Sequence, residues 1–186
     1  TDQMLDSPTN NFCTLNPLDI SGTTLTYSEG NLKCERTSSS QAQAYSSFSF
    51  DTGKWYTEAI IETNGNIALG LITGTTNPSG DRYLGQDSYT YSYYPDGRKV
   101  NSASYTSYGS SYNTGDVIGI AVDADTGVLT FYKNNVSQGN AFTGLSAPYR
   151  FAASSESSTW AIFNFGQDSS FAGNKTAQGN QDSNSI

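Results

Sequence analysis

The sequence predicts an all-β protein built as a two-sheet antiparallel β-sandwich. Short apolar or alternating segments recur at regular spacing, Gly, Asn and Asp turn residues separate them, and no segment shows a convincing helical period. The clearest example is residues 115–145, which read as two successive β-hairpins. Here 117–122 is an apolar run typical of a buried strand, and Gly127 ends a turn. Leu129 and Phe131 then share one face of the next strand.

Turn signals divide the rest of the chain into further strands. Gly30 marks an early hairpin, Asn64-Gly65 is the strongest short hairpin signal, and Asn134-Asn135 tolerates the left-handed backbone of a tight turn. Residues 102–114 are expected to be a long Ser/Tyr/Gly loop. Strands are expected at residues 12–20, 25–28, 32–36, 45–50, 54–63, 67–73, 89–94, 98–101, 117–122, 128–132, 150–153 and 160–165.

The length of 186 residues suits one domain with a sizeable core. Residues 1–23 are expected to join the sandwich as an extended N-terminal segment, and residues 24–167 to form the sandwich itself. Residues 168–186 contain few apolar side chains, and they are expected to be a polar linker or tail to further sequence.

Composition excludes two classes of partner. The formal net charge is −8 and the nine basic residues are scattered, which argues against nucleic-acid binding. No apolar run approaches membrane-spanning length, and no apolar core near the N-terminus indicates a signal peptide, so membrane insertion is not expected.

The sequence contains no histidine, which removes Ser–His–Asp and Cys–His catalysis and most transition-metal ligation. The remaining possibility is carboxylate chemistry at Glu58 and Glu62, which share one face of a predicted strand. Residues four apart on a strand lie about 13 Å apart, whereas a retaining glycosidase needs carboxyl groups about 5 Å apart. Two solvated carboxylates are favoured, and no catalytic residue is predicted.

Neither a metal nor a cofactor is expected. Asp123 and Asp125 resemble the start of a calcium loop, but Gly127 falls at position five and Asn134 at position twelve, so a hairpin turn explains them better. Cys13 and Cys34 are the only cysteines. Spacing leaves open whether they form a disulfide or remain two thiols.

Tyrosine is concentrated between residues 83 and 112. Tyrosine offers a large amphipathic contact surface at low entropic cost, and the neighbouring Ser, Gly and Asn adapt their hydrogen bonds, as in antibody binding loops. The alternative is that many of these rings belong to the core or to cross-strand pairs. Tyr105, Tyr108 and Tyr112, at the loop ends, are the better ligand candidates.

Several short motifs follow one another in a specific order and spacing. They are Gly53-Lys54-Trp55-Tyr56, Ala68-Leu69-Gly70-Leu71, Tyr83-Leu84-Gly85, Tyr108-Gly109, Gly115-Asp116-Val117-Ile118-Gly119, Gly127-x-Leu129-x-Phe131-Tyr132-Lys133-Asn134, Ala141-Phe142-Thr143-Gly144-Leu145 and Phe163-Asn164-Phe165-Gly166. With these motifs the chain resembles the SPRY domain, a β-sandwich of the concanavalin A-like lectin and glucanase type. Asn135 stands where that family more often has Gly.

The resemblance implies a non-catalytic binding module that recognises a protein or a cell-surface glycan through loops at one rim of the sandwich. The matching loops are residues 74–82, 95–99, 102–113 and 154–159. The candidate ligand-binding residues are Asp81, Tyr94, Arg98, Tyr105, Tyr108, Tyr112 and Trp160.

Residues 6–17 resemble SPRY proteins of marine phages, in which the domain belongs to tail-fibre or other virion proteins. This resemblance implies a virion or extracellular location, a host receptor or glycan as ligand, and other virion subunits as further partners. The alternatives are a glycan hydrolase or carbohydrate-binding module of the same architecture, and a structural spacer or assembly domain.

Overall fold

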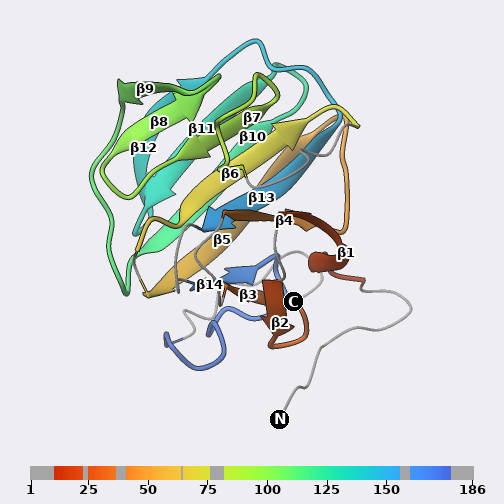
Figure 1. The fold of residues 1–186 in the computed structure, drawn as a ribbon, viewed down its shortest axis with the longest axis vertical. Coiled ribbons are helices and arrows are strands. Elements are labelled where there is room, and N and C mark those ends of the chain that lie inside the picture. The colour runs from red at the N-terminus through yellow and green to blue at the C-terminus, as the bar shows by residue number, and fades with distance from the viewer. Residues whose placement is uncertain are drawn as a thin grey trace.

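The protein is a sandwich of two β-sheets (Figure 1). All fourteen regular elements are strands, and no helix in the described part of the chain has the length and apolarity to cross a membrane. The computed structural model describes residues 11–22, 25–36, 41–63, 65–75, 82–155 and 160–176.

Each sheet has seven strands, and every neighbouring pair is antiparallel. The first sheet has the order β1 (Leu15–Gly22), β4 (Ala42–Ser46), β13 (Tyr149–Ser155), β6 (Ala68–Thr73), β7 (Thr90–Tyr93), β8 (Arg98–Asn101) and β9 (Ser104–Ser107). The second has the order β12 (Val136–Phe142), β11 (Val128–Lys133), β10 (Val117–Asp123), β5 (Lys54–Thr63), β14 (Trp160–Asn164), β3 (Lys33–Arg36) and β2 (Leu25–Ser28). The predicted fold class is confirmed.

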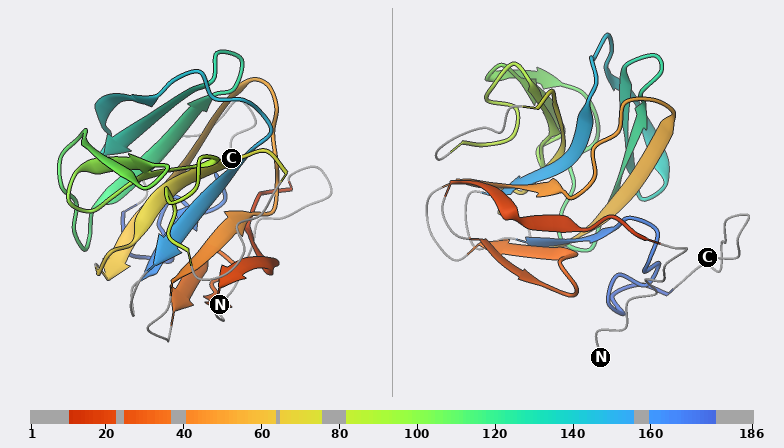
Figure 2. Two further views of the ribbon diagram at one scale, coloured as in Figure 1. Left: turned by 45° about the horizontal axis from the view of Figure 1, so that its top comes forward. Right: turned by 90° about the vertical axis from the view of Figure 1, so that its right-hand side faces the viewer.

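The core lies between the sheets and is made by alternate residues of facing strands, as the pleat requires. In β10, Ile118, Ile120 and Val122 are buried, and they belong to the same apolar cluster as Leu69 and Leu71 of β6. Figure 2 shows the two layers from the side. Burial of this shared face is the main stabilising contribution to the sandwich.

Two smaller apolar clusters cover the outer faces of the sheets. Leu84 packs on the outer face of the first sheet with Tyr94 and Val100. On the second sheet, Phe171 is 4% exposed and clusters with Ile60. The segment predicted as a linker therefore packs on the sandwich in its described part, residues 168–176.

Two strand predictions needed correction. The predicted loop 102–114 contains β9, because Ser102 and Ala103 both adopt positive φ and close a two-residue hairpin with β8. The strand predicted at 45–50 is β4, which ends at Ser46, where the side chain hydroxyl donates to the Phe48 carbonyl and turns the chain. Strand β5 at Lys54–Thr63 matches its prediction.

Gly70 of β6 is expected to tolerate no side chain. A Cβ there would overlap the Tyr91 carbonyl oxygen and lie 2.9 Å from Ser92 Cα, both in the backbone of β7. We expect Gly70→Ala to lower the free energy of unfolding by about 3 kcal/mol, measured by urea denaturation. Gly119→Ala is the control, because its Cβ meets the far end of the Tyr56 side chain, which can move. Equal stability of the two variants would contradict this packing.

Candidate functional site

Three of the predicted ligand residues lie together on the first sheet. The Arg98 guanidinium carbon is 4.4 Å from the centre of the Tyr105 ring, and the Tyr94 and Tyr105 ring centres are 5.5 Å apart. Tyr83, from the segment before β7, completes this tyrosine–arginine cluster, with its ring centre 6.1 Å from that of Tyr105. Asp96 pairs with Arg98 at 2.5 Å.

Only part of the tyrosine–arginine cluster is open to a ligand. Tyr105 is 37% exposed and the Arg98 side chain is 46% exposed. Tyr94 is only 6% exposed, and its ring packs against that of Tyr105 from the protein interior. Burial alone would raise the pKa of Asp96, but hydrogen bonds from Arg98 lower it below its usual range. The arginine is therefore held against the ring by a charged partner.

Two other predicted residues are structural, which corrects the prediction for Tyr112 in particular. Tyr112 is fully buried, and its hydroxyl donates to the carbonyls of Ile67 and Tyr93 at 2.8 Å each. Tyr108 is half-buried, and its hydroxyl donates to Gly139 O while accepting the Phe131 N–H. Tyr112 leaves the set of direct ligand residues, because no ligand reaches a side chain in the closed core.

Two predicted residues remain, Asp81 and Trp160, and the structure places only Trp160. Asp81 lies outside the described residues, as do 76–80 and 156–159 of the predicted rim loops. Trp160 lies at the start of β14 in the second sheet, where the Lys33 ammonium sits 5.2 Å from its ring centre. Lys33 also pairs with Glu62 at 2.6 Å.

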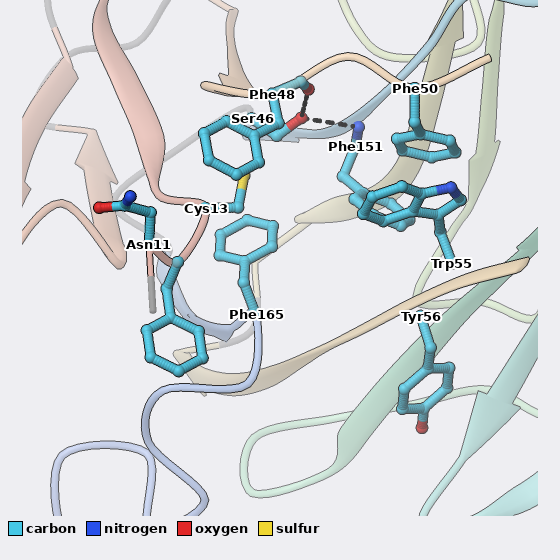
Figure 3. Close-up of a pocket in the computed structure, with 10 residues that line it drawn as sticks. Asn11, Cys13, Ser46, Phe48, Phe50, Trp55, Tyr56, Phe151 and Phe165 are labelled. Atoms are coloured by element: carbon cyan, nitrogen blue, oxygen red, sulfur yellow. Dashed lines mark hydrogen bonds between the residues drawn. The ribbon is translucent and has the colours of Figure 1, made fainter. Parts of the chain in front are cut away.

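An aromatic pocket that the sequence did not predict opens on a different part of the surface, with a volume of about 130 Å³. Figure 3 shows Cys13, Phe48 and Phe165 on one side of it and Phe50, Phe151 and Trp55 on the other. Phe48 and Trp55 are 43% and 42% exposed, so large parts of two rings face solvent. The aromatic pocket is lined by Asn11, Phe12, Cys13, Ser46, Phe48, Phe50, Trp55, Tyr56, Phe151 and Phe165.

The connection between β4 and β5 positions one wall of the aromatic pocket. Phe50 exchanges both backbone hydrogen bonds with Tyr149, at 3.0 and 2.9 Å. Its ring stacks on that of Trp55, with centres 4.8 Å apart and planes 23° apart. The Trp55 indole N–H donates to the Thr52 carbonyl at 2.8 Å, which fixes the ring in this orientation.

The segment before β1 forms the opposite wall. The Ser47 hydroxyl accepts the Thr14 N–H at 3.1 Å, and the Gln167 amide donates to the Cys13 carbonyl at 2.9 Å. Cys13 and Cys34 are both free thiols in the structure. Burial raises the pKa of each, that of Cys34 to about 12, so the Cys13 thiol is a neutral, weakly polar part of the wall.

The acidic residues weighed as catalytic or metal-binding groups have structural partners. Asp123 accepts the Thr126 N–H at 3.1 Å and Asp125 accepts the Gly53 N–H at 2.8 Å, as expected of turn residues. Glu58 accepts the Tyr56 hydroxyl at 2.8 Å, and Glu62 pairs with Lys33. Within the described ranges, no group of three or more Cys, Asp or Glu side chains is arranged to hold a metal ion.

Two antiparallel sheets of seven strands place this protein in the class of β-sandwich domains. Residues 54–168 match the model of the SPRY domain family, and the chain belongs to that family. SPRY domains are typically modules that bind other proteins.

Comparisons with individual proteins agree. The crystal structure of the SPRY domain of human HERC1 superposes with a TM-score of 0.70, covering 83% of this chain and 99% of that chain at 16% identity, which shows the shared fold. The E3 ubiquitin-protein ligase RKP of Arabidopsis thaliana is 37% identical over 95 residues, 50% of this chain. The probable ATP-dependent RNA helicase ddx1 of Dictyostelium discoideum is 28% identical over 112 residues, 60% of this chain. The matches span only 7% and 14% of these relatives.

Sequence reasoning missed the aromatic pocket because its walls come from distant segments. A partial signal existed in Phe48, which lies near the end of a stretch expected to be a strand and is soon followed by the turn-forming run 51–53. An aromatic residue next to a turn is a candidate for exposure. Nothing local indicated that Cys13 and Phe165 meet it there.

The Tyr112 hydroxyl is expected to stabilise the fold. We expect Tyr112→Phe to lower the free energy of unfolding by about 1–2 kcal/mol at pH 7, because two buried carbonyls lose their donor. Burial raises the pKa of Tyr112 well above 10.0, so only the unfolded chain releases this proton just above pH 10. Wild-type stability therefore falls there by about 1.4 kcal/mol per pH unit more steeply than that of the variant.

Urea denaturation between pH 7 and 11 measures both effects. Tyr105→Phe is the control, since Tyr105 is partly exposed, and it should change stability by less than about 0.5 kcal/mol. Parallel pH profiles for wild type and Tyr112→Phe would contradict the buried position.

Proposed function

We propose that the chain is a non-catalytic protein-binding module and that its aromatic pocket receives one bulky apolar side chain of a partner protein. The observation that carries the proposal is a concave site whose walls include two half-exposed aromatic rings, Phe48 and Trp55. Partly exposed aromatic residues that border a pocket are the usual centre of binding energy in protein interfaces.

The size and chemistry of the aromatic pocket support this proposal. Its volume of about 130 Å³ is close to that of cavities of about 150 Å³ that hold one benzene molecule. The Trp55 N–H and the Ser46 hydroxyl already have backbone partners. An entering apolar group therefore leaves neither of them without a hydrogen bond.

A non-catalytic role is supported by how the acidic residues are used. Ile60, which lies between Glu58 and Glu62 on β5, is buried in a cluster with Phe171. Each glutamate is bonded to a neighbouring side chain of the protein. The carboxylates therefore serve the outer face of the second sheet, and the absence of histidine removes the common nucleophile-activating base.

The aromatic pocket is expected to bind N-acetyl-phenylalanine amide, a minimal probe for one aromatic side chain. Amide NMR titration should show shifts concentrated at residues 11–13, 46–55 and 165–167. Trp55→Ala should weaken binding at least about tenfold, because it removes one wall. Trp160→Ala is the matched control and should bind like wild type. Shifts spread over the whole surface, or unchanged binding by Trp55→Ala, would refute the proposal.

A second candidate function is recognition of a host receptor or glycan by a domain carried on a virion or outside the cell. The virion setting rests on residues 6–17, of which 6–10 lie outside the described residues. The structural feature in favour of a glycan ligand is the half-exposed Tyr105 ring beside Arg98, since an aromatic face stacks on a sugar ring and a guanidinium donates to hydroxyl groups.

Under this second candidate, the domain should bind a subset of a glycan array, and Tyr105→Ala should reduce that binding at least about tenfold through loss of stacking. Arg98→Ala should have a similar effect. Trp55→Ala is the control, because it alters the aromatic pocket and leaves the tyrosine–arginine cluster intact. No glycan bound, or equal binding by all variants, removes this candidate.

A further inference from the structure

We propose that the partner segment recognised by the aromatic pocket is basic, with a bulky apolar side chain flanked by lysine or arginine. This inference rests on the proposed protein-binding function of the aromatic pocket and names the chemistry of its partner. It follows from the charges on the two loops that border the Phe50–Trp55 wall.

The first bordering loop, residues 51–53, is joined to the turn at residues 123–126. The Gly53 N–H donates to Asp125 Oδ1 at 2.8 Å, and the Ala124 N–H donates to the Gly53 carbonyl at 2.9 Å. These bonds bring Asp123 and Asp125 to the loop that already carries Asp51 directly after Phe50. Three carboxylates are thus carried by two joined loops that border Phe50 and Trp55 in the structure.

We define the acidic rim as Asp51, Asp123 and Asp125. Among the residues that the structure describes, one cation, Lys54, forms an ion pair with it. The Lys54 ammonium is 3.6 Å from Asp123, but the lysine side chain is 79% exposed, so water screens the pair. Burial alone would raise the pKa of Asp123, yet hydrogen bonds from Thr126 and the charge of Lys54 lower it. The Asp123 carboxylate therefore stays negatively charged at neutral pH.

A groove beside the aromatic pocket shares Trp55 and Tyr56 with it and reaches Asp123. It has a volume of about 280 Å³ and is lined by Lys54, Trp55, Tyr56, Asp123 and Tyr132 among others. Figure 3 shows Trp55 facing the aromatic pocket while Tyr56 points away from it, so the two side chains flank the β5 backbone. A segment that leaves the aromatic pocket past Trp55 and enters this groove places its next side chains beside Asp123.

The charges of the acidic rim also favour one kind of binding partner for the aromatic pocket over another. A second copy of the chain carries a net charge of −8, so its approach to the acidic rim is electrostatically unfavourable. A basic segment is attracted by the same field, which raises its association rate and rejects acidic competitors. Charge complementarity therefore favours a basic partner protein.

The experiment uses the full chain with Trp160→Phe, which leaves Trp55 as the single tryptophan and hence as a fluorescent reporter within the aromatic pocket. The probes are the amidated peptides acetyl-Gly-Lys-Phe-Lys-Gly, acetyl-Gly-Glu-Phe-Glu-Gly and acetyl-Gly-Lys-Ala-Lys-Gly. We expect the Lys-Phe-Lys peptide to bind about tenfold tighter than the Glu-Phe-Glu peptide at low salt, with the difference shrinking at high salt.

Substitutions of carboxylates by amides distinguish the effect of the acidic rim from the effect of the overall net charge. Asp51→Asn with Asp123→Asn should reduce the preference for the Lys-Phe-Lys peptide to about twofold, because the rim loses two charges. Asn at position 123 keeps an oxygen that can accept the Thr126 N–H. Glu29→Gln with Glu35→Gln removes the same charge from β3 and the turn before it, and should preserve the preference.

The outcomes distinguish this inference from the function on which it rests. Equal binding of the two phenylalanine peptides overturns the basic partner and leaves the aromatic pocket as a binding site. No binding of either phenylalanine peptide overturns both. Binding of the Lys-Ala-Lys peptide as tightly as Lys-Phe-Lys overturns the inference, since charge alone then accounts for affinity. An equal loss of preference in the Glu29/Glu35 variant also overturns it.

Discussion

The surface of this sandwich depends on how the chain crosses from one sheet to the other at Phe50. The crossing is fixed by two backbone hydrogen bonds between Phe50, which lies outside the regular strands, and Tyr149 at the start of β13. Phe50 is 6% exposed, and its ring lies between those of the core residue Phe151 and of Trp55. The ring centres are 5.2 Å and 4.8 Å from that of Phe50. Packing against the core therefore fixes the Phe50 ring, and stacking on Phe50 in turn fixes the partly exposed ring of Trp55.

A second crossing, from β9 to β10, uses aromatic residues in the opposite way. There Tyr112 is fully buried, and its hydroxyl donates to the carbonyls of Ile67, just before β6, and of Tyr93, the last residue of β7. The Tyr93 and Tyr112 ring centres are 5.0 Å apart, and Tyr108 lies 5.3 Å from Tyr93. The Tyr112 and Tyr108 hydroxyl groups donate to backbone carbonyls, as polar groups next to a core usually do. Tyr93, Tyr108 and Tyr112 of the tyrosine-rich region therefore stabilise the packing of the sheets.

Local patterns were sufficient for most of the fold. The alternation in 54–63 and the hairpin residues Asn134-Asn135 act over a few positions, and the structure has β5 and the β11–β12 turn there. Strand β9 was missed because Ser102 and Ala103 are not typical of a tight hairpin turn, and its exposed Ser and Thr residues resemble a loop. Pairing with β8 overrides these weak local preferences.

The two candidate sites show the same difference between local and long-range sequence signals. Tyr94, Arg98 and Tyr105 lie close together in the sequence around one hairpin, so composition alone located the tyrosine–arginine cluster. It gave no means to tell the exposed Tyr105 from the buried Tyr112, since both occur among Ser, Gly and Asn. Residues 13, 48, 55 and 165 meet only when three separate parts of the chain are folded together, and no local pattern encodes that meeting.

The rigidity of the walls of the aromatic pocket affects both its affinity and its selectivity. Trp55 is stacked on Phe50 and its N–H is bonded to Thr52, so little side-chain entropy remains to be lost on association. Ser46 Oγ similarly joins both walls by donating to Phe48 O and accepting the Phe151 N–H at 3.1 Å. A preorganised apolar pocket supplies affinity with little selectivity, because one apolar side chain fits much like another. Selectivity must then come from charged groups around it, and at this surface those are the carboxylates of Asp51, Asp123 and Asp125, two of which are held in place by the same turn that supports the wall.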